Sequence, residues 1–335
     1  MSRRLSFAAS LRGWRWQRVE DATSDATSTG IAAEAPVSIA FGAMWALLTV
    51  VIWSAWPSYT RLSVTATLSA QDLVALRYAI GGLLLLPVLM LHARRISSRG
   101  WREGLALAFF QGAPLAMLVT VGLRFAPAGH MGALSPGLLP LFAASIGYVF
   151  LNERLSSMRV CGLALIVLGA LALAFVSIGV LAGSAWKGDI LFVCAGFMGS
   201  IYAVRMRRSG LSAMEGAALI SVYSMLFYLP LYAALWLPSS GLFTISRSEL
   251  LFQGFYQGVL MGAVSLFSLS RAIVMLGATR ATAFISLVPV LGSVLGAAIL
   301  NEVPSIIECG GIVAISLGVL LTTGIVSFQF RRIAS

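Results

Sequence analysis

The chain has 335 residues, of which 59% are hydrophobic and only 10% are charged. Water-soluble domains carry about 25% charged residues, so this composition excludes a soluble globular protein and indicates a polytopic membrane protein. The net charge of +11 comes from short basic clusters between apolar runs. That distribution is typical of membrane orientation rather than of a nucleic-acid-binding face.

Residues 1–38 are basic and polar, unlike the rest of the chain. Five Arg and two Trp occur before Val19, and a polar stretch follows from Asp21 to Pro36. The segment lacks the continuous apolar core and the cleavage site of a secretory signal. Two interpretations stay open: a basic interfacial helix on anionic lipid, and a disordered leader or a translation start placed too early.

Ten apolar runs follow, each long enough to cross the hydrocarbon core as a helix of about 20 residues. They predict helices over Ile39–Tyr59, Asp72–His92, Gly104–Arg124, His130–Leu151, Val160–Leu181, Trp186–Val204, Ala213–Leu237, Leu250–Ser270, Ala281–Leu300 and Ile306–Val326. Membrane strands would instead alternate lipid-facing and lumen-facing residues over about ten positions. The predicted fold class is therefore an all-α integral membrane protein.

The basic residues predict the orientation of these helices. If both tails are cytoplasmic, 18 of the 23 Lys and Arg lie on the inner side. The outer side then keeps five of them: Arg61, Arg77, Arg124, Lys187 and Arg247. Because basic loops stay inside, we expect a multi-pass protein of the plasma (inner) membrane with both termini in the cytoplasm.

The sequence also repeats itself at a slowly drifting offset. The matches include Leu68-Ser69-Ala70 with Leu211-Ser212-Ala213 and Asp72 with Glu215 at 143 residues, Gln111-Gly112 with Gln257-Gly258 at 146, and Leu151-Asn152-Glu153 with Leu300-Asn301-Glu302 and Ser156 with Ser305 at 149. Small loop insertions between two copies of one unit produce such a drift. We expect the repeats to span 39–183 and 184–327, with cytoplasmic tails at 1–38 and 328–335.

Each repeat contains five predicted helices, so the second copy must enter the membrane in the opposite direction. The flanking charges agree, because Arg154 and Arg159 follow the first Asn-Glu pair whereas no Arg or Lys follows the second for many residues. Inverted repeats are a building plan of many secondary transporters, in which two halves rock about a central site.

The repeated motif resembles the EamA-type drug/metabolite transporter (DMT) superfamily. It consists of Pro140, Leu151-Asn152-Glu153-Arg154-Leu155-Ser156 and Gly162, with its copy at Pro289, Leu300-Asn301-Glu302 and Gly311. Over residues 40–326 the resemblance implies a ten-helix carrier that exports or exchanges small metabolites such as amino acids, nucleosides or drugs. The family commonly has Gly before this Glu, where this chain has Asn152 and Asn301.

Polar and aromatic residues inside the apolar runs are the candidates for a substrate cavity: Trp53, Gln111, His130, Ser135, Tyr202, Gln257 and Ser286. An amide in hydrocarbon must find partners, so the matched pair Gln111 and Gln257 either lines the cavity or bonds across a helix contact. Aromatic residues such as Trp56 could equally form an interfacial belt.

His130 is the interior candidate that could titrate near neutrality, since the reference pKa of histidine is about 6.5. Pro136 and Pro140 follow it, and proline frees backbone carbonyls in a membrane helix that neighbours, water or substrate must satisfy. We therefore expect the fourth helix to form a cavity wall. The alternative is an interfacial histidine in a gently kinked, packed helix.

Charged residues at helix ends are candidates for a gate or a charge site: Arg124, Glu153, Arg271 and Glu302. The arginines could hold a cargo carboxylate or snorkel to the headgroups. The glutamates could act as alternating gates, or accept hydrogen bonds from the start of the next helix. No acid lies near the middle of a predicted helix, which favours a neutral, zwitterionic or anionic cargo.

The favoured function is a secondary carrier whose partners are a small-molecule cargo and the lipid bilayer. A receptor or scaffold and a membrane-embedded enzyme are the alternatives, although the two His and scattered acids indicate neither a metal cluster nor a catalytic triad. No GxxxxGK[ST] loop for ATP-driven pumping is present. We expect no catalytic residue, cofactor, metal or nucleic acid, and the oligomeric state stays open, a homodimer included.

Overall fold

The apolar runs of the sequence fold as helices, several of them in two or three pieces. The computed structural model describes residues 36–151, 155–179, 183–276 and 278–323, and those residues contain no strand. In chain order the elements are α3 (Pro36–Ala66), α4 (Ala70–His92), α5 (Ser98–Gln111), α6 (Ala113–Gly122), α7 (Ala128–Leu134), α8 (Leu139–Leu151), α9 (Ser157–Gly179), α10 (Ala185–Ser209), α11 (Ala213–Leu235), η2 (Leu237–Ser239), η3 (Gly241–Phe243), α12 (Arg247–Gln253), the π-helix η4 (Gly254–Val264), α13 (Ser265–Leu276), α14 (Ala278–Ile285), α15 (Val288–Leu300) and α16 (Ile306–Thr322).

These elements form ten spans, numbered here in chain order. Spans 1, 2, 5, 6, 7 and 10 are the single helices α3, α4, α9, α10, α11 and α16, whereas span 3 joins α5 and α6, span 4 joins α7 and α8, span 8 joins α12, η4 and α13, and span 9 joins α14 and α15. Nine described stretches are long and apolar enough to cross a membrane, and α16 is a shorter apolar helix of 17 residues. The described residues thereby confirm the predicted fold class, an all-α membrane protein of ten spans. The predicted tails fall almost wholly outside the described residues, although α3 already begins at Pro36.

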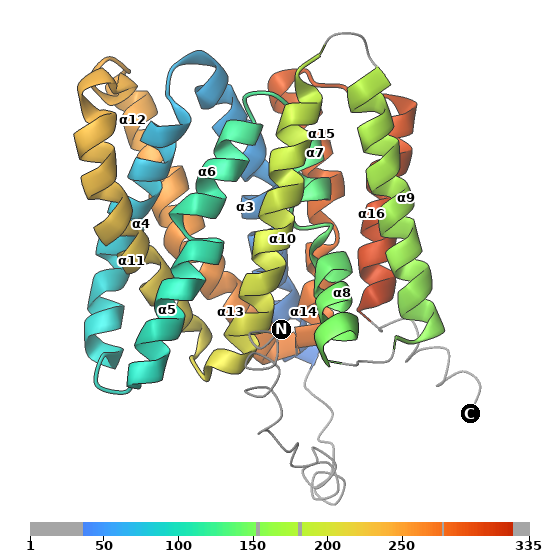
Figure 1. Cartoon of the computed structure of the whole chain (residues 1–335), viewed down its shortest axis with the longest axis horizontal. Helices are drawn as coiled ribbons and strands as arrows, with labels where there is room; N and C mark the ends of the chain where they lie inside the picture. Colours follow the sequence, from blue (N-terminus) through green and yellow to red (C-terminus); the bar gives the residue numbers. More distant parts are fainter. Residues whose placement is uncertain (1–35, 152–154, 180–182, 277, 324–335) are drawn as a thin grey trace, which may run out of the picture. The chain divides into compact units, whose positions relative to one another are not determined.

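The two repeats run through the bundle in opposite directions. In Figure 1, α8 ends at the lower end of the helices and α15 ends at the upper end, while α9 rises and α16 descends. We call the end at which α3 finishes the upper end and the opposite one the lower end. The matched Asn-Glu motifs therefore follow helices that finish at opposite ends, as an odd number of spans per repeat requires.

Matched sequence also produces matched helix starts. Ser69 caps α4 and Ser212 caps α11, and each forms a reciprocal capping box with the acid three residues later, Asp72 or Glu215. The serine oxygen accepts from an otherwise unpaired N–H group of the first turn, and the carboxylate accepts from the cap residue. The repeat thus preserves the local signals that begin a helix.

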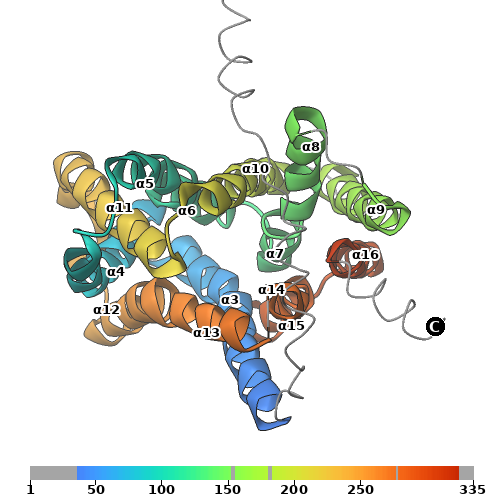
Figure 2. The same cartoon turned by 90° about the horizontal axis from the view of Figure 1, so that it is seen from below.

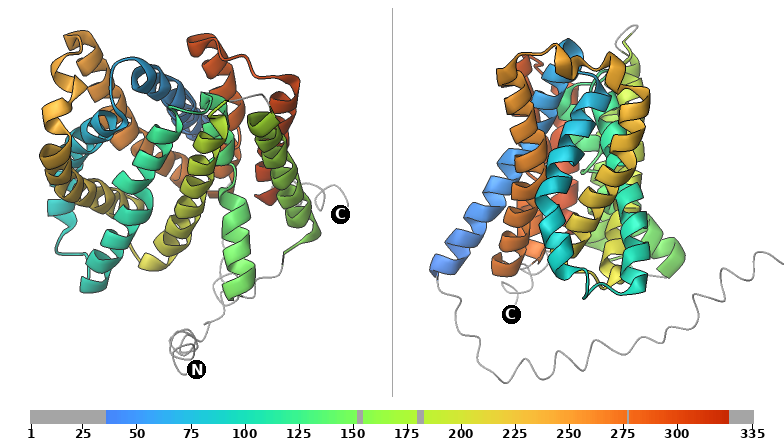
Figure 3. Two further views of the ribbon diagram at one scale, coloured as in Figure 1. Left: turned by 45° about the horizontal axis from the view of Figure 1, so that its top comes forward. Right: turned by 90° about the vertical axis from the view of Figure 1, so that its left-hand side faces the viewer.

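Spans 2, 4 and 5 each pack against their own copy in the other repeat, whereas span 3 packs on span 6. Helix α9 packs along α16, α4 along α11, and α7 on α15, while α5 and α6 pack on α10. The mirror of this last contact joins span 8 to span 1, where Tyr256 donates a hydrogen bond of 2.9 Å to the carbonyl of Ile52. Figure 2 shows the α9–α16 and α4–α11 pairs at opposite sides of the bundle, and the α9–α16 pair stays together in the views of Figure 3.

Glycine lets α9 and α16 touch backbone to backbone. A Cβ atom on Gly169 would lie 2.4 Å from the carbonyl oxygen of Gly311, and one on Gly162 would lie 2.7 Å from that of Gly318. Small residues permit this close approach in a membrane, where helix association depends on van der Waals packing. Gly162 matches Gly311 and Gly169 matches Gly318 at the offset of 149 residues, so each contact joins a glycine of one repeat to a glycine of the other.

Four spans depart from regular α-helix at matched places, where the sequence predicted continuous helices. Span 3 breaks at Gly112, and its match Gly258 lies in the π-helix of span 8. Span 4 breaks at Ser135, where a turn over 135–138 begins, and span 9 breaks at Ser286. The break requires glycine at position 112, because a Cβ there would lie 2.2 Å from the carbonyl oxygen of Ala108.

We expect Gly169→Ala to lower the free energy of unfolding by about 1–3 kcal/mol, because the added methyl must push two backbones apart. Gly310→Ala on α16 is the matched control, since nothing lies within 4 Å of its Cβ position. Thermal unfolding in detergent measures both. Equal midpoints for the two variants would show that the α9–α16 backbone contact is absent.

Candidate functional site

His130 lies at the centre of a buried charged cluster. The residue is 3% exposed. Its Nδ1 atom lies 2.9 Å from Oδ1 of Asp189 on α10, and its Nε2 atom lies 2.9 Å from Oε1 of Glu308 on α16. Ser177 of α9 donates its hydroxyl to the second oxygen of Asp189. We call His130, Asp189 and Glu308 the triad; with Ser177 it joins four helices.

The positions of the three residues follow from where their helices begin. Helix α7 begins directly after Pro127, α10 begins at Ala185, and α16 begins after Ser305. Ser305 forms a capping box with Glu308, donating its N–H to Oε2 at 2.6 Å. This bond leaves Oε1 for His130, and the N-terminal turn of α16 favours the negative charge.

A second charged cluster lies beside the triad. Arg61 of α3 forms an ion pair with Glu302, which follows α15, and donates to the carbonyl oxygen of Ala126 at 2.7 Å. Glu302 also accepts a hydrogen bond of 3.1 Å from the N–H of Ala128, the first residue of α7. The pair thereby connects span 1, the loop before span 4 and the end of span 9.

Asn301, the motif residue before Glu302, has a structural role at the end of α15. Its φ of 56° and ψ of 26° lie in the left-handed region, and it caps the end of α15. Only Gly, and less often Asn or Asp, adopts this conformation readily. Asn301 thus performs the role for which glycine is the usual residue, and it turns the chain so that Glu302 faces Arg61.

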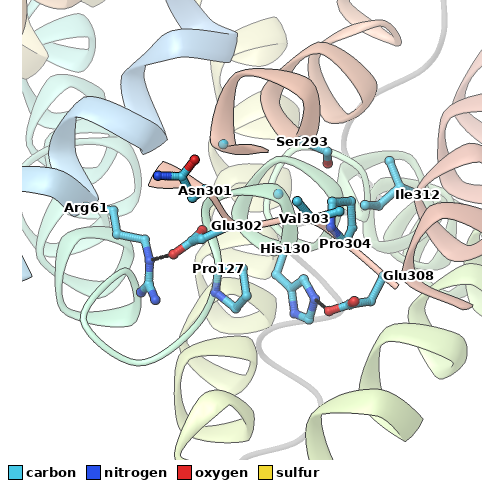
Figure 4. Close-up of a pocket in the computed structure, with 12 residues that line it drawn as sticks. Arg61, Pro127, His130, Ser293, Asn301, Glu302, Val303, Pro304, Glu308 and Ile312 are labelled. Atoms are coloured by element: carbon cyan, nitrogen blue, oxygen red, sulfur yellow. Dashed lines mark hydrogen bonds and ion pairs between the residues drawn. The ribbon is translucent and has the colours of Figure 1, made fainter. Parts of the chain in front are cut away.

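Both clusters line one cavity at the upper end. The cavity has a volume of about 340 Å³ and includes side chains from α3, α7, α15 and α16 in its wall. Figure 4 shows the Arg61–Glu302 pair on one side and the His130–Glu308 pair on the other, with Pro127 between them. The cavity presents one cation, two carboxylates and an imidazole, which can exchange protons or bind a polar group of a small molecule.

Gln257 forms part of a buried network between spans 1 and 8. Its amide oxygen accepts a hydrogen bond of 2.7 Å from the indole of Trp56, and its amide nitrogen donates to Thr60 at 2.9 Å. Trp56 is 5% exposed, and the guanidinium of Arg77 lies 5.1 Å from its ring centroid. The belt interpretation of Trp56 is therefore wrong, because its N–H and its ring both have buried partners.

Gln111 has a different environment although it matches Gln257 in the repeat. It is partly buried at the end of α5, and its side chain makes no hydrogen bond to another residue that the structure describes. The two amides therefore differ in what they are free to bind. The helix-contact interpretation fits Gln257, and cavity lining stays a prediction for Gln111.

The other candidates are distributed over the bundle. Ser135 and Ser286 are buried at the breaks of spans 4 and 9, where Ser286 donates to the carbonyl of Ala283 at 2.7 Å. Trp53 and Tyr202 are partly buried, whereas Arg124 and Arg271 are exposed. Glu153 lies outside the described residues. Of the predicted site residues, the cavity thus contains His130 and Glu302.

Sequence reasoning missed Arg61, Asp189 and Glu308 as site residues. It searched for acids near the middle of helices, whereas Asp189 and Glu308 lie close to helix starts. One usable signal was that Asp189 is the single acid of α10 and directly precedes its long apolar stretch. Its meeting with His130 depends on the packing of α7 against α10, which sequence spacing does not show.

The inverted five-span repeats and their buried polar sites define a multi-pass membrane protein built as two pseudosymmetric halves. The family model described as the EamA-like transporter family matches residues 40–175 and 186–324, so the chain belongs to this transporter family. A solved structure titled "Crystal structure of protein" superposes with a TM-score of 0.56 at 18% sequence identity, covering 84% of this chain and 96% of its own. That likeness shows the fold alone. No curated protein matches the chain.

We expect Arg61→Gln and Glu302→Gln each to reduce the free energy of unfolding by about 1–3 kcal/mol, because each leaves polar partners unpaired. The double variant should lose less than the sum of the two, with a coupling of at least about 0.5 kcal/mol. Denaturation in detergent gives the cycle. The control cycle uses Glu103 and Arg205, a more exposed pair at 2.9 Å, whose coupling should be smaller. Additive effects at Arg61 and Glu302 would contradict the assigned ion pair.

Proposed function

We propose that this protein is a secondary carrier that moves a small metabolite, such as an amino acid or a nucleoside, across the plasma membrane by efflux or exchange. The observation that carries the proposal is the matched interruption of spans 3, 4, 8 and 9. In transporters, interrupted membrane helices occur where backbone groups line a binding site, because irregular backbone in hydrocarbon must be satisfied there.

Alternating access is supported by an asymmetry between the two ends of spans 4 and 9. At the upper end, α7 packs directly on α15, and Glu302 bonds to both Arg61 and the start of α7. At the lower end, α8 packs on α10 while α14 packs on α13. Opening the upper end would separate α7 from α15 and break the bonds of Glu302. Its copy Glu153 would then take the mirror-related role at the start of α14.

Counterflow of labelled metabolites in proteoliposomes tests the proposal. We expect saturable exchange of a cargo drawn from amino acids, nucleosides and cationic drugs. Gln111→Ala should change the apparent affinity for the cargo with little loss of stability, since the Gln111 amide makes no hydrogen bond to another described residue. Gln257→Ala should chiefly lower the free energy of unfolding, because it leaves the side chains of Trp56 and Thr60 without their hydrogen-bond partner. An absence of saturable exchange for every cargo class would refute the carrier and favour a receptor or scaffold.

The proposed orientation places both termini and the lower end in the cytoplasm, as the basic loops favour. In a cysteine-free background, we expect Thr244→Cys at the upper end to react with an impermeant thiol reagent in intact cells. Arg208→Cys at the lower end should react only after the membrane is permeabilised. Both positions are exposed, so the reverse labelling pattern would overturn the orientation while leaving the fold intact.

A further inference from the structure

We propose that His130, Asp189 and Glu308 form a proton-binding site that couples this carrier to a proton gradient. The inference rests on the proposed function for its coupling, but the proton site itself stands on the geometry of the triad. Binding of one further proton changes the net charge of the triad from −1 to zero.

The two carboxylate contacts of His130 determine how many protons the triad holds. A neutral imidazole has a single N–H, and an ionised carboxylate only accepts hydrogen bonds. Both ring nitrogens of His130 lie 2.9 Å from carboxylate oxygens, so each of these two contacts requires a proton. The triad therefore holds two protons, either as an imidazolium between two carboxylates or as a neutral imidazole with one carboxylic acid. Its net charge is −1 in both cases.

A third proton can bind at Asp189. The remaining oxygen of Glu308 accepts from a backbone N–H, that of Ser305, which cannot become an acceptor. The remaining oxygen of Asp189 accepts from the hydroxyl of Ser177, and a hydroxyl both donates and accepts. A proton on Oδ2 of Asp189 can therefore donate to Ser177 once that hydroxyl rotates. The O–H bond forms on Asp189, and the triad becomes neutral while Asp189 and Ser177 stay hydrogen-bonded to each other in the reversed direction.

The N-terminal turn of α16 favours a negative charge on Glu308, but the neighbouring charged side chains that the structure describes bring no free cation to the triad. Arg61 and Glu302, the other charged side chains of the cavity wall, pair with each other. On α10 the neighbouring cation Lys187 is exposed and lies 5.8 Å from the ring centroid of Trp186. Helix α9 contributes the uncharged Ser177, and α15 the uncharged Ser293. One excess negative charge in a membrane-embedded site favours uptake of a proton.

The triad also separates two different environments. His130 and Glu308 line the polar cavity at the upper end. Asp189 and Ser177 line an apolar groove of about 790 Å³ between α8, α9 and α10, whose wall includes exposed residues such as Leu171 and Ile178. A proton can thus arrive from the polar cavity.

The coupling follows from which helices the triad joins. His130 belongs to the first repeat, whereas Asp189 and Glu308 belong to the second. The repeat does not duplicate the site, since at offsets of 143 and 149 Asp189 matches Ala46 and Glu308 matches Arg159. Proton binding therefore changes the contact between the repeats at one end of the molecule. With that end outside, a proton taken up there and released in the cytoplasm would drive cargo outward.

The proton site is tested without any cargo. The chain has two His, so His92→Asn leaves His130 as the sole signal in protein labelled with ¹⁵N-histidine and reconstituted in lipid. We expect ¹⁵N NMR and infrared spectra together to show two protons on the triad at neutral pH. Acidification should add a carboxylic-acid C=O band that Asp189→Asn removes, that Ser177→Ala shifts, and that Glu103→Gln leaves unchanged. A neutral imidazole with both carboxyl groups ionised, or an acid band that survives Asp189→Asn, would overturn the site.

Transport separates this inference from the proposed function. In proteoliposomes, a pH gradient should drive uphill accumulation of the cargo found by counterflow, in wild type and in Glu103→Gln. Asp189→Asn should abolish that accumulation. Cargo exchange in wild type that is indifferent to the pH gradient would refute the coupling and leave the carrier standing. A titrating triad in a protein that exchanges no cargo would refute the carrier and leave the proton site standing.

Discussion

The hydrocarbon core of a bilayer offers no water to a polar group, so every N–H, carbonyl and charge inside the bundle must find its partner within the protein. This constraint explains why the buried side chains at the upper end occur in sets. His130 has two carboxylates, and Arg61 has a carboxylate and backbone carbonyls. Each set joins several spans, so the same bonds that satisfy a charge also hold the helices in one arrangement. A change in that arrangement must therefore exchange these partners for others.

Pseudosymmetry governs the backbone of this protein, and the side chains depart from it. Spans 2, 4 and 5 pack on their copies, and the interruptions of spans 3 and 4 recur in spans 8 and 9. The chemistry differs, however, since the amide of Gln257 bonds to Trp56 and Thr60, whereas that of Gln111 bonds to no other described residue. A duplicated frame can rock between two similar states, whereas a proton site present at one end gives the two states different energies. Such a difference is what a gradient needs in order to drive transport.

Family membership and site geometry answer different questions. Membership in the EamA-like transporter family gives the class of protein, but one fold supports many cargoes. The cavity at the upper end adds what family membership does not give: a cation, an imidazole and carboxylates around about 340 Å³. Asn301 illustrates the division, because its left-handed conformation meets a backbone requirement of the motif, while the neighbouring Glu302 supplies the charge.

The sequence by itself determined the ten spans, their class and their inverted repeat, because apolar run length, flanking charge and matched motifs can be read along the chain. It also identified His130 and Glu302, since a titratable or charged residue beside hydrocarbon is conspicuous in the chain. Only the tertiary structure decided that Asp189 and Glu308 meet His130, that Arg61 pairs with Glu302, and that Trp56 is buried against Gln257. These contacts join residues 59 to 241 positions apart. Their formation depends on which helix faces pack together, and runs that are apolar on nearly every face do not encode that choice locally.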